Sequence, residues 1–328
     1  MGEYTLGPLP WTEETLEKAY WKNFTEAYKS IKEHQGYDLH ERTLSLKSAL
    51  RLFNKAADSF FATLEQFNVE VHQRGLLARN RRDDLRNFEE KFQEILYLFA
   101  STAMTLVEQS RAISRKVKLP GYTDRVSSTF SDNPRHKFIQ ELRNDLIHIT
   151  LHEPRWHLTE TFHTHRTERD RTRTTQFMLS PSRLRRSDEW HRLGREYLRQ
   201  HPNGVDLGAL IQEYRLEVTD FQGWLQNTVL AVAGDTINEY LRCNRFLKAV
   251  GSRCWWRFLL SQIVIQAGRD PYQYLDRYLT KTEVEEIQSL SHKTKEQVDR
   301  IVDLVDDYGA CDDELRSLVY KAFGVQAP

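Results

Sequence analysis

The chain has 328 residues with 47 basic and 47 acidic side chains, and the formal net charge of zero argues against long-range attraction to nucleic acid or to an anionic membrane. Only 14 Gly and 9 Pro disfavour a turn-rich sandwich or barrel, and three cysteines without CxxC spacing disfavour a disulfide framework and a thiolate zinc site. No apolar stretch is long enough to span a bilayer, and the first residues lack the basic and apolar regions of an export signal. We therefore expect a cytoplasmic, mainly α protein without contact to a membrane.

Two apolar stripes dominate the N-terminal half. A short helix comes first, capped by Thr12 and ending near Gly36. Apolar side chains then recur every three or four positions over residues 46–71 and again over residues 85–113, with a polar turn at residues 79–83 between them. This spacing predicts two long helices that form an antiparallel helical hairpin.

The middle of the chain changes character. Asn133-Pro134 predicts the start of a third helix, which runs through His148. Residues 156–162 and 172–179 are rich in Thr, Phe and Trp and lack a helical stripe, so they predict an inserted β-hairpin around residues 155–180. Ser182 or Ser187 is expected to cap a short helix that follows.

A further long helix is predicted after Asp206, its expected cap, with an apolar stripe that continues toward Tyr240. Three or four shorter helices are expected from about Gly251 on, and residues 255–260 (Trp-Trp-Arg-Phe-Leu-Leu) are interpreted as a buried helix. The predicted organisation is an N-terminal helical segment, a helical bundle that contains the hairpin, and a C-terminal helical region, with bounds 1–40, 41–250 and 251–328.

The end of the third predicted helix carries three groups suited to cutting RNA without a metal. Asn144 and His148 are four residues apart and share a helix face, and Arg143 is the neighbour of Asn144. Histidine exchanges protons near neutral pH, and arginine stabilises charge that grows on phosphoryl oxygens. We therefore expect His148 to act as general acid and base, Arg143 to stabilise the transition state and Asn144 to position them.

The segment Arg143-Asn144-Asp145-Leu146-Ile147-His148 resembles the R-N-x-x-x-H signature of the HEPN superfamily, and the order of long helices over residues 42–240 is similar to its four-helix bundle. The resemblance implies an HEPN-like antiparallel bundle and a metal-independent endoribonuclease that needs no cofactor. It also implies a homodimer whose two motif helices form one site. A role in toxin–antitoxin or anti-phage defence, with a cognate antitoxin or defence-system partner, is implied as well.

Other interpretations of the motif stay open. Arg143 could pair with Glu141, Asp145 or another acid, and His148 could simply cap the helix. A second Arg-to-His match, Arg186 and His191, lacks the Asn and the apolar pair before His. The alternative function is a non-catalytic helical module that binds protein or RNA.

Arginines are concentrated directly after the motif, where acids are fewer. Arginine contacts phosphates and stacks on unpaired bases, and Trp156 or Trp190 could add stacking, so this segment is expected to bind RNA; a solvated loop is the alternative. The expected RNA-binding residues are Arg166, Arg169, Arg171, Arg173, Arg183, Arg185 and Arg186.

Histidines also gather here, and their spacing would suit a metal-dependent hydrolase. They are His148, His152, His157, His163 and His165. Because no Cys or carboxylate stands at a clear ligand spacing to complete a site, we expect no bound metal.

Overall fold

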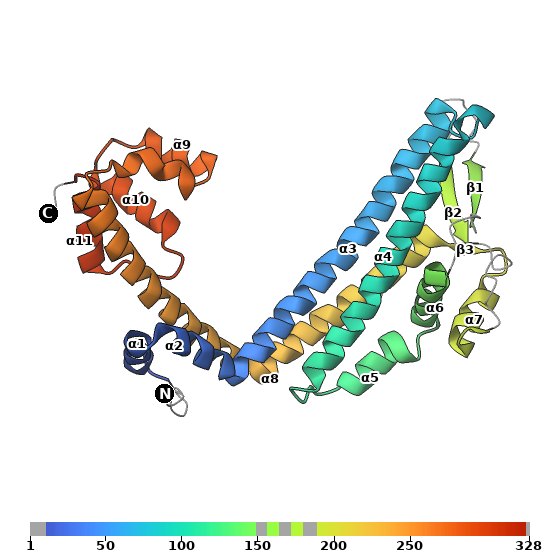
Figure 1. Cartoon of the computed structure of the whole chain (residues 1–328). Coiled ribbons are helices and arrows are strands. Elements are labelled where there is room, and N and C mark those ends of the chain that lie inside the picture. The colour runs from blue at the N-terminus through green and yellow to red at the C-terminus, as the bar shows by residue number, and fades with distance from the viewer. Residues whose placement is uncertain (1–10, 149–155, 164–171, 180–188, 326–328) are drawn as a thin grey trace. The chain divides into compact units, whose positions relative to one another are not determined.

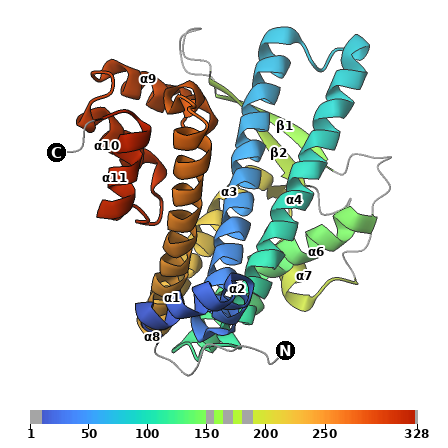
Figure 2. The same ribbon diagram turned by 60° about the vertical axis from the view of Figure 1, so that its left-hand side comes forward.

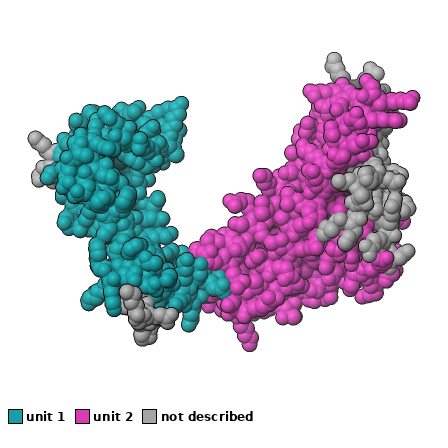
Figure 3. Space-filling view, in the orientation of Figure 1, with its two compact units in different colours: residues 1–38, 235–328 teal, residues 39–234 magenta. Residues whose placement is uncertain are grey.

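The computed structural model describes residues 11–148, 156–163, 172–179 and 189–325, and only the backbone of residues 147, 148, 156–163 and 172–175. The protein is mainly helical, as predicted, with one small antiparallel sheet (Figure 1). It divides into two compact units, which are residues 1–38 with 235–328 (unit 1) and residues 39–234 (unit 2; Figure 3). The predicted segments with bounds at 40 and 250 stay a prediction, because compactness does not show which segment folds by itself.

Unit 2 contains a long helical hairpin, several shorter helices and the sheet. Its elements are α3 (Gln35–Arg74, of which residues 35–38 belong to unit 1), the 3-10 turn η2 (Arg79–Arg81), α4 (Arg82–Ser114), α5 (Tyr122–Val126), the π-helical turn η3 (Ser127–Ser131), α6 (Pro134–His148), β1 (Trp156–His163), β2 (Thr172–Leu179), α7 (Arg192–Gln200), β3 (Val205–Asp206) and the part of α8 (Leu207–Phe258) up to residue 234.

The predicted helical hairpin is confirmed as α3 and α4, and the first part of α8 lies beside both helices in Figures 1 and 2. Phe53 of α3 stacks on Phe99 of α4 with ring centroids 4.7 Å apart, and both rings contact Tyr214 of α8 edge-on. All three side chains are buried, so the apolar stripes of the sequence meet in one core.

The predicted β-hairpin is also confirmed. β1 and β2 pair antiparallel, from Trp156 opposite Leu179 to His163 opposite Thr172. The two-residue strand β3 extends the sheet beside β2, and sequence patterning missed it because it is too short to show an alternation. Phe177 of β2 packs on Phe92 of α4 with ring centroids 4.1 Å apart, which fixes the sheet to the helical hairpin.

Several helix starts were predicted from single side chains. The Asp206 carboxylate accepts hydrogen bonds from the backbone N–H groups of residues 208 and 209 and caps α8, as predicted. Thr12 caps the first helix, also as predicted. The expected Ser cap of α7 is wrong, because His191 precedes this helix and its Nδ1 accepts from the Leu193 N–H at 3.3 Å.

Unit 1 joins the N-terminal helices to the C-terminal part of the chain. Its elements are α1 (Glu13–Lys22), α2 (Phe24–Ser30), the 3-10 turn η1 (Ile31–Glu33), the rest of α8, the π-helical segment η7 (Leu259–Gln266), the 3-10 segment η8 (Pro271–Arg277), α9 (Lys281–Ser289), α10 (Lys295–Val305) and α11 (Asp313–Ala322). The three or four short helices expected near the C-terminus are therefore confirmed.

Of two glycines expected at helix boundaries, Gly36 lies beside one, since η1 ends at Glu33 and α3 begins at Gln35, whereas Gly251 lies inside a helix. Gly36 is in the first turn of α3, where a Cβ would come within 2.7 Å of the Tyr240 Cβ and would overlap the carbonyl oxygen of Thr236. Gly251 is inside α8, where a Cβ would lie 3.0 Å from the Tyr28 hydroxyl. At both glycines another segment comes so close that a side chain would not fit without a shift.

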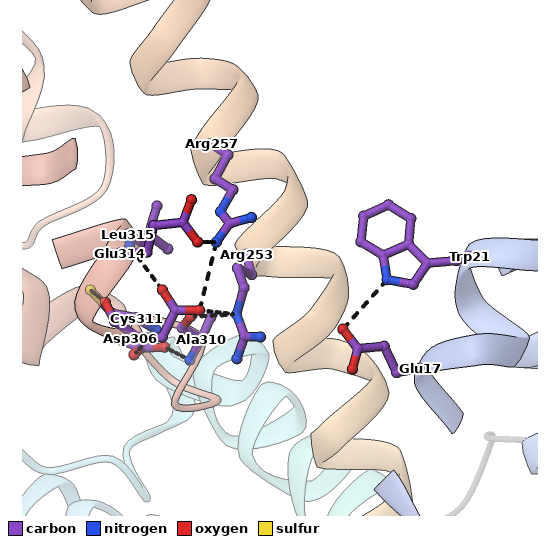
Figure 4. A network of polar contacts seen from close by, with 10 residues as sticks. Glu17, Trp21, Arg253, Arg257, Asp306, Ala310, Cys311, Glu314 and Leu315 are labelled. Carbon is purple, nitrogen blue, oxygen red and sulfur yellow. Dashed lines mark hydrogen bonds and ion pairs between the residues drawn. The ribbon is translucent and has the colours of Figure 1, made fainter. Parts of the chain in front are cut away.

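Side chains of α8 hold the loop before α11. Arg253 Nε lies 3.1 Å from the Ala310 carbonyl oxygen and 3.1 Å from an Asp312 carboxylate oxygen, and Arg257 pairs with Glu314 at 2.6 Å (Figure 4). The nearby segment 255–260 is not the buried helix expected from sequence, because Trp255 is 57% and Phe258 is 52% exposed. Only one face of this segment packs against the C-terminal core.

The cysteines of the chain, Cys243, Cys254 and Cys311, all fall within the described residues and are free. No described helix combines the length and the hydropathy that are needed to cross a bilayer.

Candidate functional site

The motif helix α6 begins where the sequence predicts. The Asn133 side-chain oxygen accepts from the backbone N–H of Arg135 at 2.9 Å, and Pro134 occupies the first helical position. Asn133 also donates from Nδ2 to Glu217 of α8 at 3.0 Å. The start of α6 is therefore fixed both by its own cap and by α8.

A buried hydrogen bond anchors the first turn of α6. His136 Nδ1 lies 2.7 Å from the hydroxyl oxygen of Tyr214 on α8, and the two side chains are 4% and 0% exposed. Burial, together with the positive charges of Lys137 and Arg111, lowers the pKa of His136 to about 3. Burial also raises the pKa of Tyr214, so both groups are neutral at physiological pH.

Arg135 makes a second link to α8. Its guanidinium donates to the carboxylates of Glu213 and Glu217, which stand four residues apart on one face of α8. The Arg135 side chain is 22% exposed, so these ion pairs are partly shielded from water. The arrangement is structural, since both partners of this cation are already supplied by the protein.

The short helix α7 packs against the middle of α6. Gly194 lies close to Lys137 and Glu141, and the Glu141 carboxylate accepts from the His191 backbone N–H at 3.0 Å. Trp190 is 5% exposed and contacts Phe138 edge-on, so the expected stacking of RNA bases on Trp190 is wrong. The apolar partner that buries it lies about 50 residues earlier in the chain, which a local pattern does not reveal.

The predicted catalytic residues lie in the last two turns of α6. Asn144 is exposed, and its Nδ2 is 3.4 Å from a Glu141 carboxylate oxygen. Arg143 is half-buried, and its Nε is shielded from solvent without a hydrogen-bond partner among the described residues. His148 is the last residue of α6, and its side chain lies outside the described part.

The helix geometry brings only two of these three residues to one face. Each residue turns an α-helix by about 100°, so Asn144 and His148 differ by about 40° around the axis, whereas Arg143 and His148 differ by about 140°. Asn144 and His148 therefore share a face of α6, as expected. Arg143 points to a different side of the same helix.

The pairing of Arg143 with Glu141, the main structural alternative, is not found. Glu141 instead accepts from the His191 N–H and from Asn144, and Asp145 is 4% exposed. Within the described residues, Arg143 Nε has no hydrogen-bond partner. His191 of the second Arg-to-His match caps α7, which is a structural role.

The other predicted functional residues cannot be placed by their side chains. Arg173 and the histidines at 157 and 163 belong to the strands with backbone only, and the remaining expected residues lie outside the described part of the chain. These are Arg166, Arg169, Arg171, Arg183, Arg185, Arg186, His152 and His165. Within the described residues, no group of three or more His, Cys, Asp or Glu could hold a metal ion.

The residues that position the motif helix are not evident from the sequence. Glu141 stands out there only as a partner for Arg143, and neither Arg135 nor His136 belongs to a recognisable pattern. One signal is available, since Glu213 and Glu217 stand at i, i+4 on a predicted helix, but their partner is about 80 residues away.

No family model, no curated protein and no solved structure matches this chain. The resemblance to the HEPN superfamily therefore stays a prediction, based on six motif residues and on the order of the helices.

Proposed function

We propose that the chain is a metal-independent endoribonuclease that cleaves single-stranded RNA. Its reactive groups would be Arg143, Asn144 and His148 at the end of α6. The observation that carries the proposal is the state of Arg143, whose Nε is shielded from water and has no hydrogen-bond partner among the described residues. An arginine whose buried Nε has no partner in the described part of the chain, beside Asn144 and one turn before a histidine, is suited to receive a phosphate.

The chemistry needs only these side chains and the RNA. The neutral imidazole of His148 takes the proton from a ribose 2′-OH, and the 2′ oxygen forms a bond to the neighbouring phosphorus. The bond from phosphorus to the 5′ oxygen breaks, and that oxygen takes a proton from an imidazolium. The products are a 2′,3′-cyclic phosphate and a free 5′-OH. Arg143 stabilises the charge on the phosphoryl oxygens, and Asn144 orients the reacting groups.

A homodimer is part of this proposal. Arg143 and His148 of one α6 are about 140° apart around the helix axis, so one helix does not direct both toward the same phosphate. Two antiparallel copies of α6 would let the Arg143 of one protomer face the His148 of the other. A dimer is also what the HEPN resemblance implies.

The test is cleavage of a labelled single-stranded RNA by the purified 328-residue chain in the presence of EDTA. We expect products with a 2′,3′-cyclic phosphate, and we expect His148→Ala and Arg143→Ala each to reduce the rate by about 100-fold or more. His191→Asn is the matched control, because it changes the histidine of the second Arg-to-His match and keeps a side-chain acceptor at the cap of α7.

Full activity of His148→Ala, or loss of activity on adding EDTA, would refute the assigned mechanism. RNA binding without cleavage by any variant would instead favour the non-catalytic module. Sedimentation of the parent chain tests the dimer separately, and mixing Arg143→Ala with His148→Ala tests the composite site. If each site takes Arg143 from one protomer and His148 from the other, a mixed dimer keeps one intact site. Mixing the two inactive variants should therefore restore part of the activity.

A further inference from the structure

Unit 1 contains a cavity of about 480 Å³ among its C-terminal elements. Its walls come from the end of α8, η7, η8, α10 and α11. The volume is within the range of roughly 300–1,000 Å³ that small-molecule sites occupy. The cavity is far in sequence from the α6 motif and has no part in the proposed ribonuclease chemistry.

The floor of this cavity belongs to the C-terminal core. It is formed by side chains that are at most 9% exposed, which are Leu260, Val264, Ile301, Val302, Val319 and Phe323. The cavity therefore reaches into the core and is not a shallow surface patch. Its floor is aliphatic and aromatic throughout, so a bound group there would gain from burying apolar surface.

The π-helical segment η7 shapes one wall. Its residues Leu259, Leu260, Ile263 and Val264 all line the cavity. π-helical turns are rare in proteins, and those that occur are often found at functional sites. Trp255 and Tyr278 also line the cavity, and they are 57% and 50% exposed. These two aromatic side chains form its mouth.

The charged residues that line the cavity have one sign. Arg269 and Arg277 are its lining residues with a formal charge, and no carboxylate is among the lining residues. Both arginines are exposed, and Arg277 lies over the Tyr274 ring with its Cζ 4.8 Å from the centroid. Within the described residues, neither guanidinium is engaged in an ion pair. The mouth is therefore cationic above an apolar interior.

We propose that this cavity binds a small amphipathic carboxylate, with its hydrocarbon part on the apolar floor and its carboxylate between Arg269 and Arg277. Arginine matches a carboxylate with two parallel hydrogen bonds. An amphipathic amine would meet two like charges. A nucleobase would leave its polar edges without partners on this floor, which would cost free energy.

The binding test uses the whole 328-residue chain and three ligands with the same hydrocarbon tail. These are dodecanoate, dodecanol and dodecylamine, each below its micelle-forming concentration, titrated by calorimetry and by tryptophan fluorescence. Trp255 and Trp256 line the cavity, so the fluorescence should change on binding. We expect saturable binding of one dodecanoate per chain, with an affinity about tenfold higher than that of dodecanol. Dodecylamine should bind more weakly than dodecanol.

Variants locate the site. The double variant Arg269→Gln, Arg277→Gln should lose the preference for dodecanoate over dodecanol. Trp255→Ala should lower the affinity for both ligands about fivefold. All three side chains are exposed, so these variants are expected to fold, which circular dichroism checks. Arg300→Gln is the matched control, because Arg300 pairs with Glu286 and does not line the cavity.

Three results would overturn the proposal. The first is the absence of saturable dodecanoate binding, and the second is equal affinity for dodecanoate and dodecylamine. The third is concentration-dependent self-association that Trp255→Ala abolishes, measured by light scattering without ligand. That result would make this face an interface between two copies of the chain.

Discussion

His136 Nδ1 lies 2.7 Å from the hydroxyl oxygen of Tyr214, and this enclosed hydrogen bond fixes the first turn of α6 to α8. The Phe130 ring contacts the imidazole edge-on, with ring centroids 5.0 Å apart. Because water is excluded, neither group could find another partner if the bond were lost. Arg143 and His148 follow two to three turns later on the same helix. By fixing the first turn of α6, this bond helps to fix the position of the proposed reactive groups.

Tyr214→Phe should lower the free energy of unfolding by about 1–3 kcal/mol, because it leaves a buried imidazole nitrogen without a partner while it changes the packing little. Urea denaturation followed by circular dichroism measures the change. Tyr97→Phe on α4 is the control, since Tyr97 is 44% exposed, and we expect it to stay within about 0.5 kcal/mol of the parent. A Tyr214→Phe variant as stable as this control would show that the bond contributes nothing.

The stability of unit 2 should fall as the pH is lowered from about 6.5 toward 3. Burial holds the pKa of His136 at about 3 in the folded chain, below its ordinary value of 6.5. The unfolded chain therefore binds one more proton in this window, and stability is lost by up to about 1.4 kcal/mol per pH unit. Above 6.5 this histidine contributes no slope.

The contribution of His136 is isolated by comparing variants. His136→Gln cannot titrate, so its stability should depend less on pH between 6.5 and 3 than that of the parent, whatever its absolute stability. His191→Asn removes a histidine at the cap of α7 and should keep the parent's slope. Equal slopes for His136→Gln and the parent in urea titrations at several pH values would contradict the buried, neutral imidazole.

Helices with a continuous apolar stripe were predictable from the sequence because their signal is local. The spacing of Phe53 and Phe60 on α3, or of Tyr214 and Phe221 on α8, depends only on the helical period, and all four side chains are buried. The cap at Asp206 is equally local, since the acceptor and the N–H groups are two and three residues apart.

The glycines show why other features were not predictable. A helix boundary was expected at Gly251, which lies inside α8. Both Gly251 and Gly36 meet a segment that is about 200 residues away in the chain, and no local pattern reveals this contact. The same holds for the site. The shared face of Asn144 and His148 follows from their spacing, whereas the pairing of Arg135 with α8 and the absence of a described partner for Arg143 Nε depend on tertiary contacts.

Two arginines of α6 should respond differently to the same substitution. Arg135→Met removes the partner of Glu213 and Glu217 and should lower the free energy of unfolding by about 1–2 kcal/mol, since the pair is partly shielded. Arg143→Met removes a shielded Nε without a described partner, so its effect should be below about 0.5 kcal/mol or stabilising. Urea midpoints of both variants give the comparison, and a larger loss for Arg143→Met would mean that this guanidinium has a structural role.

Glycine-to-alanine substitutions should separate close approach from helix propensity. In a helix interior, alanine is normally more favourable than glycine by about 0.5–1 kcal/mol, and Gly223→Ala in α8 should show this gain because no atom of another segment lies within 4 Å of the place that its Cβ would take. Gly36→Ala should instead lose about 2 kcal/mol or more, because its Cβ would overlap the Thr236 carbonyl oxygen and approach the Tyr240 Cβ within 2.7 Å, which forces α3 and α8 apart. Thermal and urea unfolding of both variants measure whether each substitution raises or lowers the stability. A gain for Gly36→Ala would mean that the start of α3 does not pack on α8 as described, since no small shift of a flexible side chain relieves an overlap with backbone.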